Sequence, residues 1–157
     1  MTTVPLDIPA GSVTRSDGYV RLSQPARLLA MQPHMHNLGA RQCLEVLYRT
    51  SGARMASEML NCANFNNNWH LTYNYEDDVQ PLLPTGTIIH SITWHDNTPG
   101  NPRALDPKNW VGDGDRTIDE MGFFWLGWID LTQEEYDKGL AERNEKRQAA
   151  GQRLSQR

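Results

Sequence analysis

The sequence predicts an all-β fold, an antiparallel β-sandwich of jelly-roll-like form that is followed by a C-terminal helix. Short segments rich in β-branched and aromatic residues alternate with turns of Gly, Pro, Asn and Asp. The chain has 157 residues, of which 38% are hydrophobic and five are Trp, enough for one buried core. We therefore expect a β-sandwich domain over residues 1–131 and a helix with a polar tail over residues 132–157.

The first half of the chain contains four predicted strands. Residues 19–22 and 26–35 have strand composition, and residues 42–48 and 54–60 flank a hairpin turn at residues 50–53. Cys43 and Cys62 are symmetric about this turn, so a regular hairpin places them opposite one another, within reach of a disulfide. A disulfide would imply an oxidising compartment. Two buried free thiols are the alternative.

The second half contains three predicted strands and one long loop. Residues 69–75 alternate apolar with polar side chains, which predicts a strand with one apolar face. Residues 87–95 form the next strand, and residues 121–131 form a very apolar last one. The loop over residues 96–115 is too long for a simple connection, so it is either functional or held by its neighbours.

The C-terminal segment has the pattern of a helix. Thr132 and Glu135 form a capping box, in which each side chain satisfies a backbone donor of the first turn. The helix is expected to run through Tyr136 and Leu140 to about Arg147. Beyond Arg143 no apolar stripe is present that could pack on a core. We expect a solvated end; a docking arm for a partner protein is the alternative.

Charge and hydropathy exclude two kinds of partner. The net charge is −4, the pI is about 5.7 and the basic residues are scattered, which argues against nucleic acid. No apolar run approaches the roughly 20 residues that span a bilayer, so no membrane span is expected. Residues 1–5 lack the pattern of a secretory signal. This fits a cytoplasmic protein, a chain cut from a longer one, or a subunit exported by other means.

Two histidines and one methionine form a candidate copper site. On a strand, His34 and His36 would project from the same face, because side chains alternate with period two. The thioether of Met121 is a poor ligand for Zn, Mg or Ca and a good one for Cu(I), so its addition would favour redox copper. Spacing alone does not bring Met121 to the pair. Taken by itself, the His-x-His pattern also fits two surface or core histidines.

A series of motifs carries a family resemblance. In chain order they are residues 33–39 (PHMHNLG), 68–70 (NWH), 84–87 (PTGT), 96–98 (DNT), 101–102 (NP), 106–107 (DP) and 114–121 (GDRTIDEM). From about Met31 to Asp130 the chain resembles the C-terminal domain of the copper type II, ascorbate-dependent monooxygenases. That family includes the peptidylglycine alpha-hydroxylating and dopamine beta-monooxygenases, and the bacterial members are the most similar.

The resemblance implies that His34, His36 and Met121 hold a catalytic copper. It also implies O2 activation and C–H hydroxylation, with electrons from a separate domain or partner protein, because the family's enzymes carry a second, all-histidine copper domain. The five His of this chain include no adjacent pair. The family is extracytoplasmic, so a periplasmic or extracellular location is expected. The alternative is a noncatalytic copper-binding or structural subunit of a larger redox complex.

Three positions depart from the family pattern. Bacterial relatives commonly have Gln in place of His70, an aromatic residue in place of His95, and Gln in place of Arg116. For His70 and for His95, orienting a ligand or being an extra ligand is the less favoured interpretation, because metal-site histidines are usually oriented by other groups rather than surrounded by spare imidazoles. Glu120 is expected to hold its loop by hydrogen bonds rather than to act as a base.

Two other features have modest expectations. His90 lies among apolar residues and is expected to be a hydrogen-bonded core or interface histidine rather than a metal ligand. The segment over residues 113–115 (DGD) resembles part of a calcium loop but lacks the full series of ligands, so calcium is the weaker alternative to copper.

Overall fold

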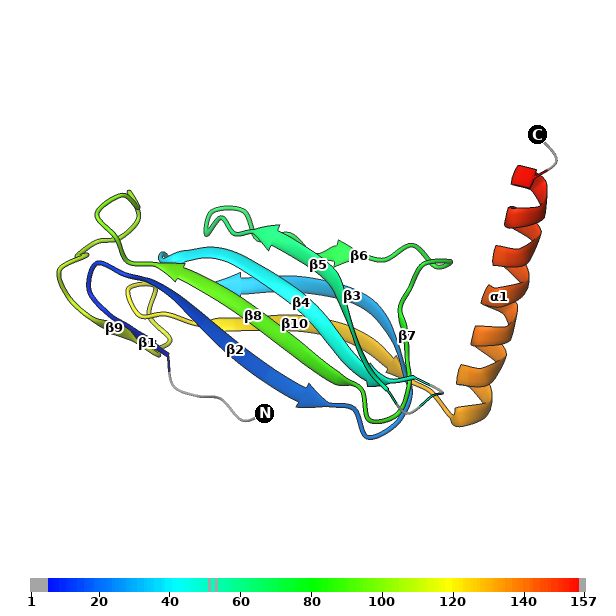
Figure 1. Cartoon of the computed structure of the whole chain (residues 1–157). Helices are drawn as coiled ribbons and strands as arrows, with labels where there is room; N and C mark the ends of the chain where they lie inside the picture. Colours follow the sequence, from blue (N-terminus) through cyan, green and yellow to red (C-terminus); the bar gives the residue numbers. More distant parts are fainter. Residues whose placement is uncertain (1–5, 51, 53, 156–157) are drawn as a thin grey trace.

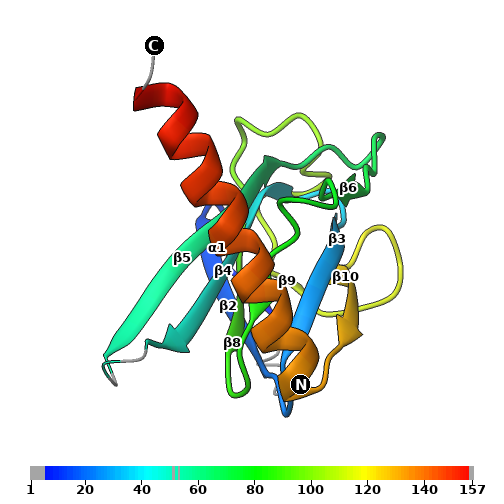
Figure 2. The ribbon, with the colours of Figure 1, turned by 90° about the vertical axis from the view of Figure 1, so that its right-hand side faces the viewer.

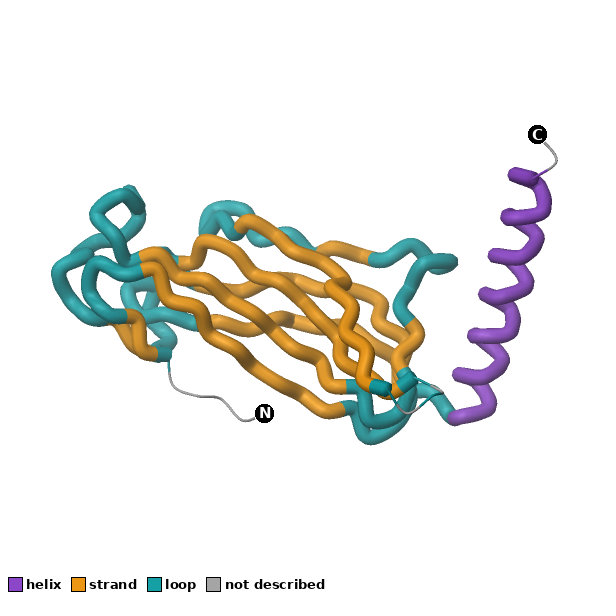
Figure 3. Tube along the Cα trace, viewed as in Figure 1, coloured by secondary structure: helices purple, strands orange, loops and turns teal. Residues whose placement is uncertain are grey.

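The structure is a computed structural model that describes residues 6–50, 52 and 54–155. Two four-stranded antiparallel sheets pack face to face, and a single helix follows the last strand (Figures 1 and 3). This confirms the expected all-β, sandwich-like fold with a C-terminal helix.

The first sheet has the strand order β2-β8-β4-β5. Its strands are β2 (Val13–Arg21), β8 (Ile88–Asp96), β4 (Gly39–Arg49) and β5 (Met55–Asn64). Each strand overlaps its predicted segment and is as long as that segment or longer.

The second sheet is built around β3 (Ala26–Met35), whose bounds match the prediction. On one side β3 pairs with β10 (Gly122–Asp130), and on the other with β6 (Tyr73–Asn74) and β7 (Leu82–Leu83). A small third sheet joins β1 (Asp7–Ile8) to β9 (Val111–Gly112), so the long loop after β8 contains a short strand and is held by the N-terminal segment.

The core lies between the two large sheets. Leu28 and Met31 of β3 pack with Leu44 and Val46 of β4 and with Ile89 of β8, and all five are buried. Removing this much apolar surface from water is the main favourable contribution to the fold, at roughly 1.5–3 kcal/mol for each large side chain.

A β-bulge in β3 decides which way its side chains point. β10 skips Leu29 when it pairs with β3. Before the bulge, Leu28 faces the core; after it, Met31 and Met35 do. One unpaired residue thus reverses the alternation of the strand. His34 consequently projects from the outer face of the sheet instead of into the core.

The β4–β5 hairpin carries a disulfide between Cys43 and Cys62, so the alternative of two free thiols was wrong. The two cysteines are direct cross-strand partners. A bulge at Leu60 creates this pairing, because the register nearer the turn would set Cys43 opposite Asn61. The turn residues Ser51 and Ala53 lie outside the described residues.

Two predicted strands differ from the structure. Residues 69–75 form a strand only at Tyr73 and Asn74, and Trp69 is 67% exposed. Asn66 holds the start of this segment in a turn by accepting hydrogen bonds from the N–H groups of Asn68 and Trp69, at 3.0 and 2.9 Å. β10 is apolar as predicted, yet it lies at a sheet edge where Trp125 is 61% exposed.

The helix α1 (Gln133–Ser155) extends beyond the predicted end at Arg147. It lies at one end of the sandwich (Figure 1), and it crosses in front of the sheets when the molecule is viewed from that end (Figure 2). Its capping box is present: Glu135 accepts from the N–H of Thr132 at 2.8 Å, and the Thr132 hydroxyl accepts from the N–H of Glu135 at 3.2 Å. Arg143 anchors the helix by donating to the carbonyl of Gln80 at 2.6 Å. The part of the chain that the structure describes holds no helix with the length and apolar character needed to cross a membrane.

Candidate metal centre

The imidazoles of His34 and His36 are neighbours at the end of β3. His34 is the second-to-last residue of β3, which ends at Met35, and His36 is the first residue after the strand. Their ring centroids are 5.5 Å apart with an angle of 80° between the planes. This is the proximity that the His-x-His spacing predicts for two residues on the same face of an extended segment.

His34 is held in the neutral form that binds metals. Its ring lies 4.7 Å from the ring of Phe123, its cross-strand partner on β10. Burial lowers the pKa of His34, and the nearby imidazoles of His36 and His70 lower this pKa further. Within the described residues, its ring nitrogens have no hydrogen-bond partner. A neutral imidazole without such a partner has a lone pair to offer a metal.

His36 has one ring nitrogen engaged and one available. Its Nδ1 lies 2.9 Å from the carbonyl oxygen of Asp119. Because a carbonyl only accepts, Nδ1 carries the proton and Nε2 of the neutral ring keeps its lone pair. Only 8% of His36 is exposed, so this bond fixes both the tautomer and the direction of the ring, as outer hydrogen bonds do in metal sites.

Glu120 fastens the segment before β10 to the turn after β3. Its carboxylate, 1% exposed, accepts from the N–H of His36 at 3.0 Å and from the N–H of Leu38 at 2.5 Å. Burial raises the pKa of Glu120, although the two backbone donors act in the opposite direction. Glu120 therefore holds its loop by hydrogen bonds, as predicted from the sequence. Gly39 closes this turn, where a Cβ would lie 2.6 Å from that of Met35.

His95 contacts the backbone of Met121. It is fully buried on β8, and its Nε2 lies 3.0 Å from the carbonyl oxygen of Met121 and 3.5 Å from the Glu120 carboxylate. Burial lowers the pKa of His95, so the ring is neutral and donates to the carbonyl. Its Nδ1 is buried and has no partner among the described residues. His95 thus contacts a residue that the resemblance names as a ligand, which was the less favoured interpretation of its place in the sequence.

The pairing of β3 with β10 brings Met121 near His36. The first residue of β10, Gly122, pairs with Met35, and one further step in this register brings Met121 beside His36. The hydrogen bonds of Asp119 and Glu120 to His36 hold the same two segments together. The half-buried Met121 is thus in a position compatible with the third ligand that the resemblance implies.

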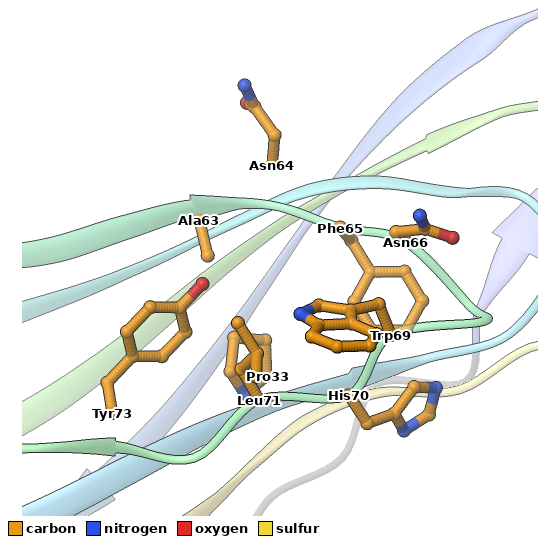
Figure 4. A pocket seen from close by; sticks show the side chains of 9 residues that line it. All are labelled: Pro33, Ala63, Asn64, Phe65, Asn66, Trp69, His70, Leu71 and Tyr73. Carbon is orange, nitrogen blue, oxygen red and sulfur yellow. The ribbon is translucent and has the colours of Figure 1, made fainter.

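A third imidazole lies near that of His34. The ring of His70, on the loop after β5, is 5.4 Å from that of His34 and 5.2 Å from that of Phe65. Figure 4 shows this loop around a small hollow lined by Pro33 and Trp69, with the imidazole of His70 turned away from Leu71. Within the described residues, no group of three or more His, Cys, Asp or Glu side chains already has a metal-binding arrangement.

His90 is separate from this site and is engaged on both sides, as expected for a structural histidine. Its Nδ1 lies 2.8 Å from a carboxylate oxygen of Glu45, and its Nε2 lies 2.7 Å from one of Asp17. Its ring stacks on Tyr19 at 4.4 Å. Desolvation tends to raise the pKa of Asp17, but hydrogen bonds from Arg15 and His90 outweigh it and hold this pKa low.

The acidic segment over residues 113–119 is tied up in internal bonds. Asp113 accepts from the N–H of Leu6 at 2.9 Å, and Asp119 pairs with Arg116 through both carboxylate oxygens at 2.7 and 2.8 Å. These contacts fix the loop that carries Glu120.

Comparison of the chain with models of protein families returned no match, and comparison with curated proteins also returned none.

Proposed function

We propose that this chain is the copper-binding domain of a monooxygenase-like protein, with His34, His36 and Met121 as ligands. The observation that carries the proposal is the adjacency of two imidazoles. One is oriented by the Asp119 carbonyl, and the ring of the other makes no hydrogen bond within the described residues. Soft thioether and imidazole donors together suit copper better than they suit the other common metals.

Bound copper would supply O2 activation and C–H hydroxylation, with electrons from a separate domain or partner protein. The residues of the chain have definite tasks in such a site. Phe123 partly desolvates His34, Glu120 holds the backbone of His36, and His95 holds the carbonyl of Met121. These contacts keep the two ligand-bearing segments in one arrangement, which reduces the reorganisation needed when a metal binds or changes charge.

The second candidate is a noncatalytic copper-binding or structural subunit of a larger redox complex. It is favoured by the exposed aromatic side chains near the site, since Trp69 and Trp125 are both more than half exposed. Large exposed aromatic residues are typical of surfaces that contact other proteins. Such a partner could complete the site or simply bury it.

We also propose a periplasmic or extracellular location. The Cys43–Cys62 disulfide supports this proposal, because structural disulfides persist mainly in oxidising compartments.

Copper stoichiometry under reducing, anaerobic conditions tests the site. We expect about one tightly held copper per chain in the wild type, lost in His36→Ala and weakened in Met121→Ile. Absence of bound copper, or copper that is indifferent to both substitutions, would refute the proposal. Ascorbate-dependent O2 consumption, measured with and without a candidate electron donor, then separates the enzyme from the noncatalytic subunit.

A further inference from the structure

We propose that His70 is a third imidazole ligand of the copper, recruited by the oxidised ion. This inference rests on the proposed copper site at His34, His36 and Met121. It adds a ligand that the family resemblance does not imply.

The ring separations agree with a shared ion. An imidazole nitrogen lies about 2 Å from a bound first-row metal ion, and the ring centre lies about 1 Å further away. Two rings on one ion therefore have centroids about 4.2 Å apart at the roughly 90° angle of a tetragonal Cu(II) site, and about 5.2 Å apart at roughly 120°. His34 is 5.5 Å from His36 and 5.4 Å from His70 by this measure. The rings are thus spaced for a shared ion at the wider angle, and they have to close by about 1 Å in a tetragonal site.

The orientation of the rings favours coordination over stacking. The planes of His34 and His70 meet at 78°, so an edge rather than a face is presented. Within the described part of the chain, the ring nitrogens of His70 make no hydrogen bond, whereas both nitrogens of His90 do. His70 therefore loses no protein hydrogen bond when it binds a metal.

The loop that carries His70 is anchored beside the metal site. Asn67 donates to the side-chain oxygen of Asn37 at 3.2 Å, and Asn37 directly follows the ligand His36. Phe65 packs against the ring of His70, and its N–H donates to the carbonyl of Ala40 at 2.9 Å. The part of the loop before His70 is thus fixed to Asn37 and to β4 at Ala40, which keeps His70 within reach.

A side-chain rotation completes the site. The described residues contain no preformed group of three metal-binding side chains of the His, Cys, Asp or Glu types. His70 is exposed, so rotation of its side chain between staggered positions meets little resistance. Cu(II) prefers nitrogen donors in a tetragonal arrangement, whereas Cu(I) is well served by a thioether. The third imidazole therefore matters most for Cu(II).

Pulsed EPR of the Cu(II)-loaded protein counts the bound imidazoles and provides the test. We expect three in the wild type and two in His70→Gln, with Cu(II) affinity lowered by roughly tenfold or more, as for loss of a group that supports a metal site. The effect on Cu(I) affinity should be smaller. Asn68→Gln is the matched control: it changes a neighbouring exposed amide of the same loop and should leave three imidazoles.

The possible failures are distinguishable. If His70→Gln binds copper with the same imidazole count as the wild type, the third ligand is refuted and the site of His34, His36 and Met121 stands. If copper binding by the wild type is absent or unaffected by His36→Ala, the proposed function fails and His70 fails with it. Circular dichroism of each variant shows whether the fold is retained, which we expect because His70 is exposed.

Discussion

His34 and His90 lie on central strands of the two sheets, yet their imidazoles are in opposite situations. His90 is bonded at both nitrogens to carboxylates and stacked on Tyr19. His34 has other imidazoles and Phe123 around it, and its pKa is lowered. The difference shows that residue type and strand position are not enough to make a histidine a metal ligand. A ring nitrogen must also have a lone pair available, and the neighbouring side chains decide whether it has one.

The largest effect on stability is expected from substitution of Glu120, whose carboxylate holds the two ligand-bearing segments together. Glu120→Ala leaves the buried N–H groups of His36 and Leu38 without an acceptor and creates a cavity. We expect a loss of about 3–4 kcal/mol in the free energy of unfolding, measured by denaturant titration. Copper affinity should fall as well. A variant as stable as the wild type would mean that Glu120 does not hold these segments together.

Removal of a ligand should separate binding from stability. His34→Ala is expected to lower copper affinity at least about a hundredfold, which corresponds to roughly 2.7 kcal/mol. Because the ring of His34 makes no hydrogen bond to any residue that the structure describes, the free energy of unfolding without copper should change by less than about 1 kcal/mol. Competition with a chelator and thermal unfolding measure the two quantities. A large loss of stability with unchanged copper affinity would mean that His34 is a structural histidine like His90 and not a metal ligand.

The opposite result is expected at the structural histidine. His90→Leu leaves Asp17 and Glu45 without their shared donor, which should cost about 2 kcal/mol of stability, since both carboxylates are partly exposed. Copper stoichiometry should be unchanged. The contrast between the two regions would collapse if this variant lost copper while keeping its full stability.

A smaller effect is expected from pH. Burial lowers the pKa of His95 below its usual value of 6.5. The unfolded chain therefore takes up a proton at this residue before the folded chain does, so His95 lowers the stability of the fold as pH falls below about 6.5. Glu120, whose pKa is raised, acts in the other direction: its contribution is lost as pH rises through its folded pKa.

Urea titrations at pH 7.5 and 5.5 isolate the contribution of His95. The stability difference between these pH values should shrink by about 1 kcal/mol in His95→Gln, which keeps a donor for the Met121 carbonyl. An unchanged pH dependence would show that the buried imidazole is not held neutral in the fold.

Local patterns predicted the sheets better than they predicted the direction of single side chains. The bounds of β3 and the pairing of Cys43 with Cys62 follow from composition and symmetry. Yet the side-chain directions in β3 depend on a bulge at Leu29, and the cysteine pairing depends on a bulge at Leu60. No residue pattern indicated either bulge. A bulge is decided by how whole strands pack, and the alternation within a short segment does not contain that information.

The resemblance proposed the members of the candidate site, His34, His36 and Met121, but not its surroundings. The hydrogen bonds of Glu120 were expected from its place in the sequence beside Met121. The approach of His70 to His34 depends on a turn at Asn66 that replaced a predicted strand. Copper, activity and location are still predictions, because they depend on chemistry outside the chain.

The bulge at Leu29 makes the candidate site depend on a residue count. A β3 with Leu29 deleted would alternate regularly and still place His34 on the outer face, because Leu29 is the one residue that the ladder skips. A β3 that kept Leu29 in a regular ladder would exchange its two faces after that point, so that His34 would enter the interior and Pro33 would lie outside. The site therefore depends on where one extra residue is accommodated, with every ligand still encoded. Scans that only substitute residues would miss this requirement, whereas a length-variant library of β3 would detect it at once.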